Sequence, residues 1–158
     1  MDGRSRRWAT ITFVAPDAGL VIDLLDAFRR SKAMFTAATL GVFDLLEERP
    51  RRAEEFSEKA MDRLLDACVA LGLLACEDGV YRNTPAASRY LTRESPDSMI
   101  GYVLYSDRVL YPMWGHLAEA VREGSHRWKQ TFGLEGPLFD HFFQTDDAMR
   151  TFLRGMHG

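Results

Sequence analysis

One stretch limits what this chain can fold into more than any other: residues 31–46, which read SKAMFTAATLGVFDLL. Side chains before and within it recur at helical spacing, which predicts one long helix from Asp17, as its N-cap, to Leu40. The residues that share a face of this helix are Val21, Leu24, Leu25, Phe28, Phe35 and Thr39. Alanines occupy many of the remaining positions, so the side chains on the rest of the helix are short. A helix whose side chains are apolar or short on nearly every side is stable only when it is buried. A short chain does not easily supply enough surface of its own to cover such a helix.

The patterns that follow predict further short helices. Gly41 suits the end of the long helix, after which Val42 to Leu46 restarts as a second one. Ala53 to Ala60 reads as a polar helical turn, and Met61 to Leu71 reads as an amphipathic helix. The apolar side of the latter contains Cys68, whose thiol is therefore predicted to be buried and unpaired.

A β-hairpin is predicted over Leu73 to Asn83, because the dipeptide at positions 78–79, Asp-Gly, is a strong two-residue turn signal. Helix, helix and hairpin in this order is typical of a winged helix. Short helices are then expected to start at Pro85 and at Pro96. Pro112 is expected to break or kink the next helical pattern. The sequence therefore predicts a mainly α fold with one small hairpin.

Size and composition exclude several classes of protein. With 158 residues and a net charge of −3, the chain fits one domain and has no general attraction to nucleic acid or anionic membranes. No run approaches the roughly 18 apolar residues of a membrane span. Two cysteines, Cys68 and Cys76, make no disulfide framework, which favours a reducing, cytoplasmic location. Residues 1–16 are expected to be a solvated tail.

Residues 31–46 also resemble the start of the dimerisation domain of small-molecule O-methyltransferases of the acetylserotonin type. Further segments that resemble this family follow in order: RLLDACVALGLL at 63–74, YRNTPAASRYLT at 81–92, WGHLAEAVREG at 114–124 and FLRGMHG at 152–158. The resemblance implies a winged-helix-like dimerisation domain over residues 17–158. It also implies a homodimer in which the N-terminal helices of two copies are intertwined.

In this family, S-adenosylmethionine and the catalytic histidine belong to a Rossmann-like domain that follows the dimerisation domain. The resemblance therefore leads us to expect that this chain, which ends at Gly158, lacks that domain. We expect no catalytic residue, no cofactor site and no metal site within it. The glycine-rich run from Gly133 to Pro137 lacks the preceding strand and the tight spacing of a dinucleotide-binding turn. Residues Glu47 to Asp62 are too short for the family's full helix-turn-helix, which is expected to be compressed here.

The residues around the expected kink at Pro112 are rich in aromatic side chains. These are Tyr102, Tyr105, Tyr111 and Trp114. Packing in the core and between helices is one interpretation, because such side chains are often buried. The resemblance implies another, in which this domain lines a pocket for a flat, indole-like acceptor. Tyr105 and Trp114 would then be substrate-binding residues, and Phe28 and Phe35 would reach a partner's pocket through the dimer.

Three functions remain open. The first is a dimerisation module that also covers the acceptor pocket and is not catalytically competent alone. The second is an enzyme, an O-methyltransferase that uses S-adenosylmethionine on a small hydroxylated substrate. The third is a DNA-binding regulator, since winged helices often bind DNA. The recognition helix would then expose Asp62, Arg63 and Asp66, a net acidic set that disfavours phosphate contacts.

Overall fold

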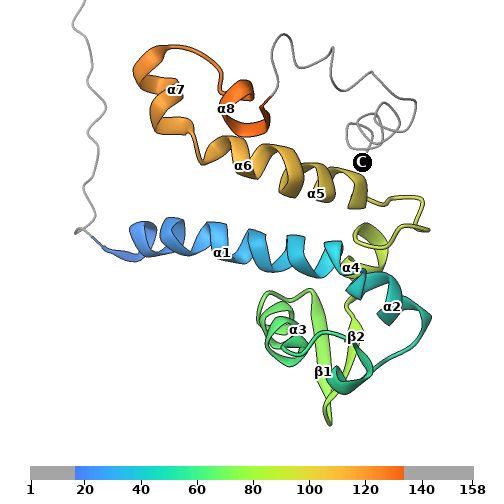
Figure 1. Ribbon diagram of the computed structural model, residues 1–158. Coiled ribbons are helices and arrows are strands. Elements are labelled where there is room, and N and C mark those ends of the chain that lie inside the picture. The colour runs from blue at the N-terminus through green and yellow to red at the C-terminus, as the bar shows by residue number, and fades with distance from the viewer. Residues whose placement is uncertain (1–16, 134–158) are drawn as a thin grey trace, which may run out of the picture.

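Helix α1 (Gly19–Thr39) crosses the middle of the molecule and separates two groups of elements (Figure 1). The first group, the hairpin body, contains α2 (Val42–Glu48), η1 (Ala53–Glu55), α3 (Met61–Ala70), β1 (Leu74–Glu77), β2 (Val80–Asn83) and α4 (Pro85–Tyr90). The second group, the upper helices, contains α5 (Ile100–Tyr105), η2 (Ser106–Leu110), α6 (Tyr111–Trp114), α7 (Leu117–Glu123) and α8 (Trp128–Phe132). The mainly helical fold with one hairpin is thus confirmed.

The computed structural model describes residues 17–133. The tail predicted over residues 1–16 lies outside the described residues, and so does the greater part of the loop predicted from Gly133 to Pro137.

The long helix predicted over residues 17–40 is confirmed within two residues at each end. Its N-cap is Ala18 rather than Asp17, because the Asp17 Oδ1 accepts a hydrogen bond from the Gly19 amide at 3.0 Å and so caps from one position earlier. At the other end Gly41 adopts a φ of 71°. This left-handed conformation costs roughly 1–2 kcal/mol for a residue with a side chain, so glycine is suited to the turn between α1 and α2.

The core lies where the C-terminal half of α1 packs on the hairpin body. Its largest fully buried side chains are Val42, Phe43, Leu65 and Cys68. Phe35, Ala37 and Ala38 of α1 are buried against them, and the two alanines bring the α1 backbone close to its neighbours. Burial raises the pKa of the Cys68 thiol to about 11, so the prediction of a buried free thiol is confirmed.

The predicted hairpin is confirmed, with Leu74 paired to Asn83 and Glu77 to Val80 in an antiparallel register. Asp78 and Gly79 form its turn at φ values of 51° and 75°. Positive φ at both turn residues is the signature of the two-residue turn whose twist matches that of the strands. The sequence signal and the backbone therefore agree at this position.

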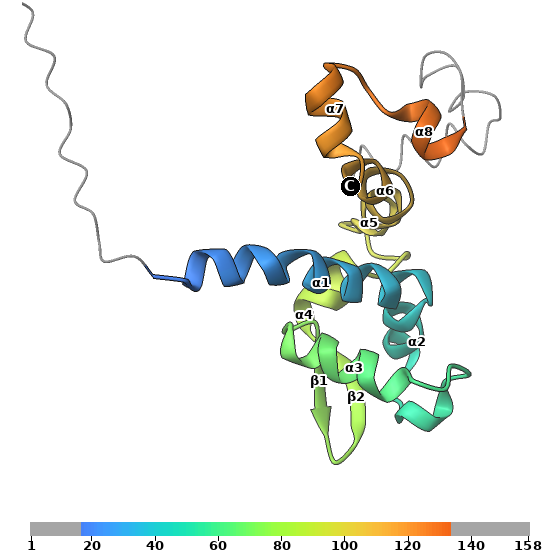
Figure 2. The same ribbon diagram turned by 60° about the vertical axis from the view of Figure 1, so that its left-hand side comes forward.

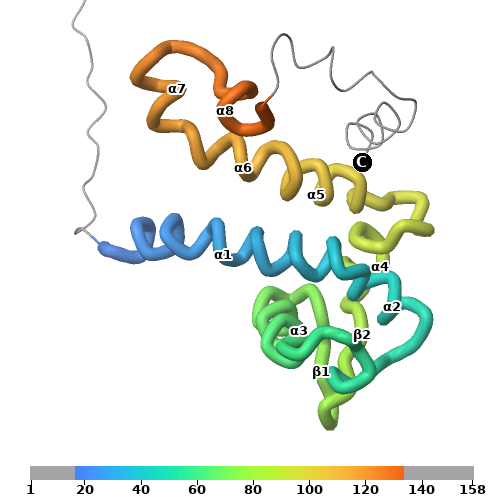
Figure 3. Tube along the Cα trace, viewed as in Figure 1, coloured from blue at the N-terminus to red at the C-terminus, as the bar shows by residue number. Residues whose placement is uncertain are grey.

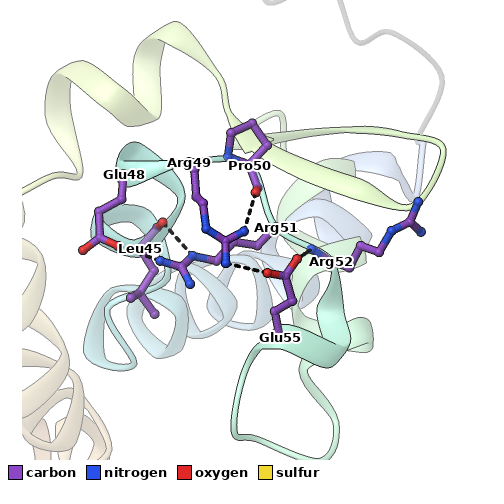
Figure 4. A network of polar contacts seen from close by, with 7 residues as sticks. All are labelled: Leu45, Glu48, Arg49, Pro50, Arg51, Arg52 and Glu55. Carbon is purple, nitrogen blue, oxygen red and sulfur yellow. Dashed lines mark hydrogen bonds and ion pairs between the residues drawn. The ribbon is translucent and has the colours of Figure 1, made fainter.

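The short connection between α2 and α3 is held by arginine contacts (Figure 4). Arg49 pairs with Glu55 at 2.6 Å, and Arg51 pairs with Glu48 at the same distance. The Arg51 backbone also forms an isolated bridge to Tyr81 on β2, with N–O distances of 3.1 and 2.8 Å. The connection is thus tied to the hairpin by backbone pairing, with only the single turn η1 as helix. This is the region that the sequence predicts to be compressed.

The prediction of a helix that starts at Pro96 is wrong. Residues 93–99 form turns, and the next helix, α5, begins at Ile100. Side-chain bonds compete with helix formation here, because the Ser95 hydroxyl donates to the Arg89 carbonyl at 2.5 Å and Arg89 pairs with Asp97 at 2.8 Å. Such local bonds to serine and aspartate favour turns over helix.

The expected break at Pro112 takes the form of a π-helical segment. Residues 106–110 are π-helical, and the Tyr111 amide donates to the Ser106 carbonyl five residues earlier. Proline has no N–H and cannot continue the ordinary ladder, so the widened turn absorbs the interruption just before it. As a result α5, η2 and α6 follow one another over α1 without a chain break (Figure 3).

Candidate functional site

The N-terminal half of α1 extends beyond the hairpin body (Figure 2). Six large side chains there keep between 52% and 70% of their surface exposed. They are Leu20, Val21, Ile22, Leu24, Leu25 and Phe28, and we call them the α1 face. The face predicted along the whole helix is therefore divided, with Phe35 buried and the earlier residues open. A continuous apolar patch of this kind marks an interaction surface rather than ordinary exposure.

A second apolar surface lies on the upper helices. Trp114 at the end of α6 is 67% exposed, and Leu117 and Val121 on α7 are 47% and 74% exposed. We call these three residues the α6–α7 face. In the predicted apolar series across α5 to α7, Val103 is buried and Leu110 is half-buried, whereas the later members are exposed. The described residues thus present two exposed apolar faces, one on α1 and one on α6 and α7.

The four residues predicted to bind an acceptor are placed in three different surroundings. Phe28 belongs to the α1 face and Trp114 to the α6–α7 face. Tyr105 is half-buried at the end of α5. Phe35 is buried in the core, where its ring meets Tyr111 edge-on at a centroid distance of 6.3 Å. The structure therefore exposes two of the four on separate faces and does not gather all four into one site.

The aromatic residues near Pro112 are not a closed core cluster. Tyr102, Tyr111 and Trp114 are all exposed to solvent, which contradicts burial in the core for these three. Tyr111 nevertheless packs edge-on against Phe35 of α1, as expected for packing between helices. Tyr105 is the most sheltered, and its pKa is raised by burial and, secondarily, by the neighbouring Tyr102. A raised pKa keeps the phenol protonated and able to donate a hydrogen bond near neutral pH.

Two residues that the sequence does not single out connect α1 to the upper helices. Lys32 of α1 forms an ion pair with Asp107 of η2, and its ammonium group lies 5.3 Å from the centre of the Tyr111 ring. They are 75 positions apart in the chain, so no local pattern relates them. Only a signal of three-dimensional contact could have found this pair.

The described residues offer no evident place for a metal. Within residues 17–133, no group of three or more histidine, cysteine, aspartate or glutamate side chains could hold an ion. None of the helices in that range combines the length and apolarity needed to cross a membrane. On α3, Asp62, Arg63 and Asp66 are exposed as the sequence predicts, and Asp66 also accepts a hydrogen bond from the Tyr81 hydroxyl at 2.7 Å.

Comparison with known proteins identifies the fold. Residues 22–93 match the O-methyltransferase dimerisation domain. The chain is 37% identical over 151 residues to acetylserotonin O-methyltransferase of Gallus gallus, which covers 87% of this chain and 44% of that protein. It is also 37% identical over 145 residues to the tetracenomycin polyketide synthesis 8-O-methyl transferase TcmO of Streptomyces glaucescens, which covers 87% of this chain and 41% of that protein.

Among solved structures, human N-acetylserotonin methyltransferase in complex with S-adenosylmethionine aligns with a TM-score of 0.79 and 35% identity. The alignment covers 92% of this chain and 46% of that one.

Residues 22–93, which contain most of the long helix, the short helices that follow it and the hairpin, match an O-methyltransferase dimerisation domain. The relatives place this chain beside the acetylserotonin O-methyltransferases, which confirms the resemblance read from the sequence. The chain spans less than half the length of these relatives.

Proposed function

We propose that this chain is the homodimerisation module of an S-adenosylmethionine-dependent O-methyltransferase of the acetylserotonin type, and that it lines part of the acceptor site. The observation that carries the proposal is the α1 face. Water contact with six large apolar side chains is unfavourable, and burying each fully would contribute roughly 1.5–3 kcal/mol. A second copy supplies the same apolar residues and so offers a matching surface, as expected for a symmetric dimer.

The α6–α7 face extends the surface available to that second copy. Permanent dimer interfaces typically bury more than about 2,000 Å² and resemble a protein core. A single half-helix is too small for such an interface, whereas α1, α6 and α7 together present apolar residues over a broad area. We infer an intertwined arrangement in which α1 of one copy packs against both faces of the other.

The acceptor role rests on the aromatic residues beside these faces. Phe28 and Trp114 are exposed, and the half-buried Tyr105 at the end of α5 offers a protonated phenol. Flat aromatic rings pack well against such side chains, and a phenol can orient a polar substituent. Phe35 would contribute indirectly, because its buried ring packs against Tyr111 and does not face solvent. The solved relative carries N-acetylserotonin in its name, which fits a substrate of this chemistry.

The methyl donor would be held by another part of a protein of the relatives' length. A Rossmann-type donor site needs a glycine-rich turn between a strand and a helix. Within residues 17–133, the passage from β2 to α4 runs through Asn83, Thr84 and Pro85 and contains no glycine. We therefore place no catalytic or donor-binding role on the described residues. On this view residues 17–158 form one module, and 1–16 are a tail.

A cytoplasmic location is part of the same proposal. Cys68 and Cys76 are both free thiols, and an oxidising compartment would expose Cys76 to modification.

The test is the oligomeric state measured by analytical ultracentrifugation at micromolar concentration. We expect the wild-type chain to sediment as a dimer and Leu24→Glu to sediment as a monomer with unchanged helical circular dichroism. Arg30→Gln is the matched control, because it changes the charge of the same helix by the same amount and its side chain pairs with Asp23 rather than with a residue of the α1 face. A well-folded wild-type monomer at this concentration would refute the proposal.

A further inference from the structure

The contact between α1 and η2 is unlike the other ion pairs of α1. Lys32 pairs with Asp107, whose side chain is only 12% exposed. The pairs Asp23–Arg30 and Asp26–Arg29 join residues of the same helix and remain open to solvent. Exposed pairs within one helix contribute little and cannot fix one element on another. A sheltered carboxylate, in contrast, loses much if its partner is removed, because the charge remains with poor solvation.

Two further contacts converge on the same place. The Lys32 ammonium lies 5.3 Å from the centre of the Tyr111 ring, within the range of a cation–π interaction. Phe35, three residues further along α1, meets the same ring edge-on. Residues three apart lie on one side of a helix, so Lys32 and Phe35 hold Tyr111 from a single side of α1.

The segment that carries Asp107 is the π-helical turn η2. Tyr105 stands immediately before this turn and Tyr111 immediately after it. A π turn adds one residue to the helical repeat, and any rearrangement of it rotates the residues on either side. The way in which Asp107 of η2 is held against α1 therefore affects the placement of both tyrosine rings.

We propose that Lys32 and Asp107 are positioning residues, whose ion pair anchors η2 on α1 and so sets the placement of the Tyr105 and Tyr111 rings beside the acceptor-facing surface. The inference rests on the proposed function for its biological meaning, because the proposed acceptor site is where these rings would meet an aromatic acceptor. The pair itself touches no acceptor. It acts through the π turn and the rings on either side of it.

The experiment uses the full chain with 3-fluorotyrosine at all five tyrosines, so that ¹⁹F NMR reports each ring separately. Assignment uses single Tyr→Phe variants. We expect Asp107→Asn, which keeps the shape of the side chain and removes its charge, to move the Tyr105 and Tyr111 signals by more than a linewidth. The signals of Tyr81 and Tyr90 in the hairpin body should stay in place.

Conservative variants distinguish positioning from simple stabilisation. Asp107→Glu and Lys32→Arg keep the charges and should retain the wild-type signals. Asp23→Asn is the matched control, because it breaks an ion pair of α1 that has no partner on another element, and it should move neither signal. If Asp107→Asn does not fold, Lys32→Gln tests the same contact from its more exposed end.

Two outcomes would overturn the proposal. One is a lower urea midpoint for the neutral variant with the Tyr105 and Tyr111 signals unmoved, which would show a purely structural pair. The other is a shift of all five signals together. Sedimentation of the same wild-type sample reports the dimer independently, so a monomer that still shows the two selective shifts would refute the proposed dimer and leave the positioning role standing.

Discussion

At the scale of single residues, burial changes the chemistry of Cys68 more than any neighbour does. Its side chain is fully buried, and desolvation alone accounts for the rise of its pKa to about 11. A thiolate in an apolar core would be poorly solvated, so the folded state favours the protonated form. Cys76, on the hairpin, is exposed. The two cysteines therefore differ in reactivity, as the position of Cys68 on the apolar side of its predicted helix indicates.

This difference predicts how stability depends on pH. The unfolded thiol ionises near pH 9.0, whereas the folded thiol holds its proton to about pH 11. The stabilisation is complete below the lower value and is lost as pH rises through the higher one, because the unfolded state then binds fewer protons. We expect urea unfolding of the wild type to lose roughly 2 kcal/mol more than Cys68→Ala between pH 8 and pH 11. Equal losses in the two proteins would contradict this, and Cys76→Ala should behave as the wild type.

At the scale of elements, the hairpin body is held together by polar links between neighbours that are distant in sequence. Asn83 on β2 and Ser88 on α4 both donate to the Glu47 carboxylate on α2, at 2.9 and 2.6 Å. The bonds from Ser88 and then Asn83 lower the pKa of Glu47. Tyr81 likewise joins β2 to α3 through Asp66. These links orient short elements that have too little apolar surface to do so alone.

The Tyr81 link can be tested by removing one oxygen atom. Tyr81→Phe keeps the buried ring and deletes the hydroxyl that donates to Asp66, so we expect a loss of about 1 kcal/mol in the free energy of unfolding by urea. Asp66 remains exposed to water, which limits the cost. Tyr90→Phe is the control on an exposed tyrosine and should change the free energy by less than half as much. A larger effect at Tyr90 would mean that the Tyr81 bond does not stabilise the hairpin.

At the scale of the whole molecule, one half of α1 is in the core and the other half is open. The buried half is anchored by the hairpin body, and the open half carries the α1 face. In the proposed dimer, the second copy would complete the burial of this helix. Association and folding would then be linked, because a partner that binds only the folded state stabilises it by mass action.

This linkage predicts that thermal stability depends on protein concentration. We expect the melting temperature of the wild-type chain to rise steadily when the concentration is raised a hundredfold, as measured by circular dichroism. Leu24→Glu should melt at a temperature independent of concentration, and Arg30→Gln should follow the wild type. A wild-type melting temperature that does not change over this range would argue against the dimer even if some association is seen in sedimentation.

Much of the fold could be predicted from sequence because its elements are specified locally. The helical spacing around Phe28 and Phe35, the left-handed glycine at position 41 and the Asp-Gly turn at 78–79 act within a few residues of one another. The segment after Pro96 was mispredicted as a helix because side-chain bonds, including the Arg89–Asp97 pair, override a proline start signal. The sequence identifies the aromatic residues of the candidate site by their residue type, but it does not predict which of them are exposed.

The sequence by itself determined most of the segments that are helix or strand and the family that they resemble, because periodicity, caps and turns are properties of neighbouring residues. Only the tertiary structure decided that α1 is buried in one half and open in the other, that Phe35 supports the core while Phe28 faces solvent, and that Lys32 meets Asp107. The physical reason is that burial and ion pairing depend on which distant surfaces come together. No spacing along the chain encodes that directly.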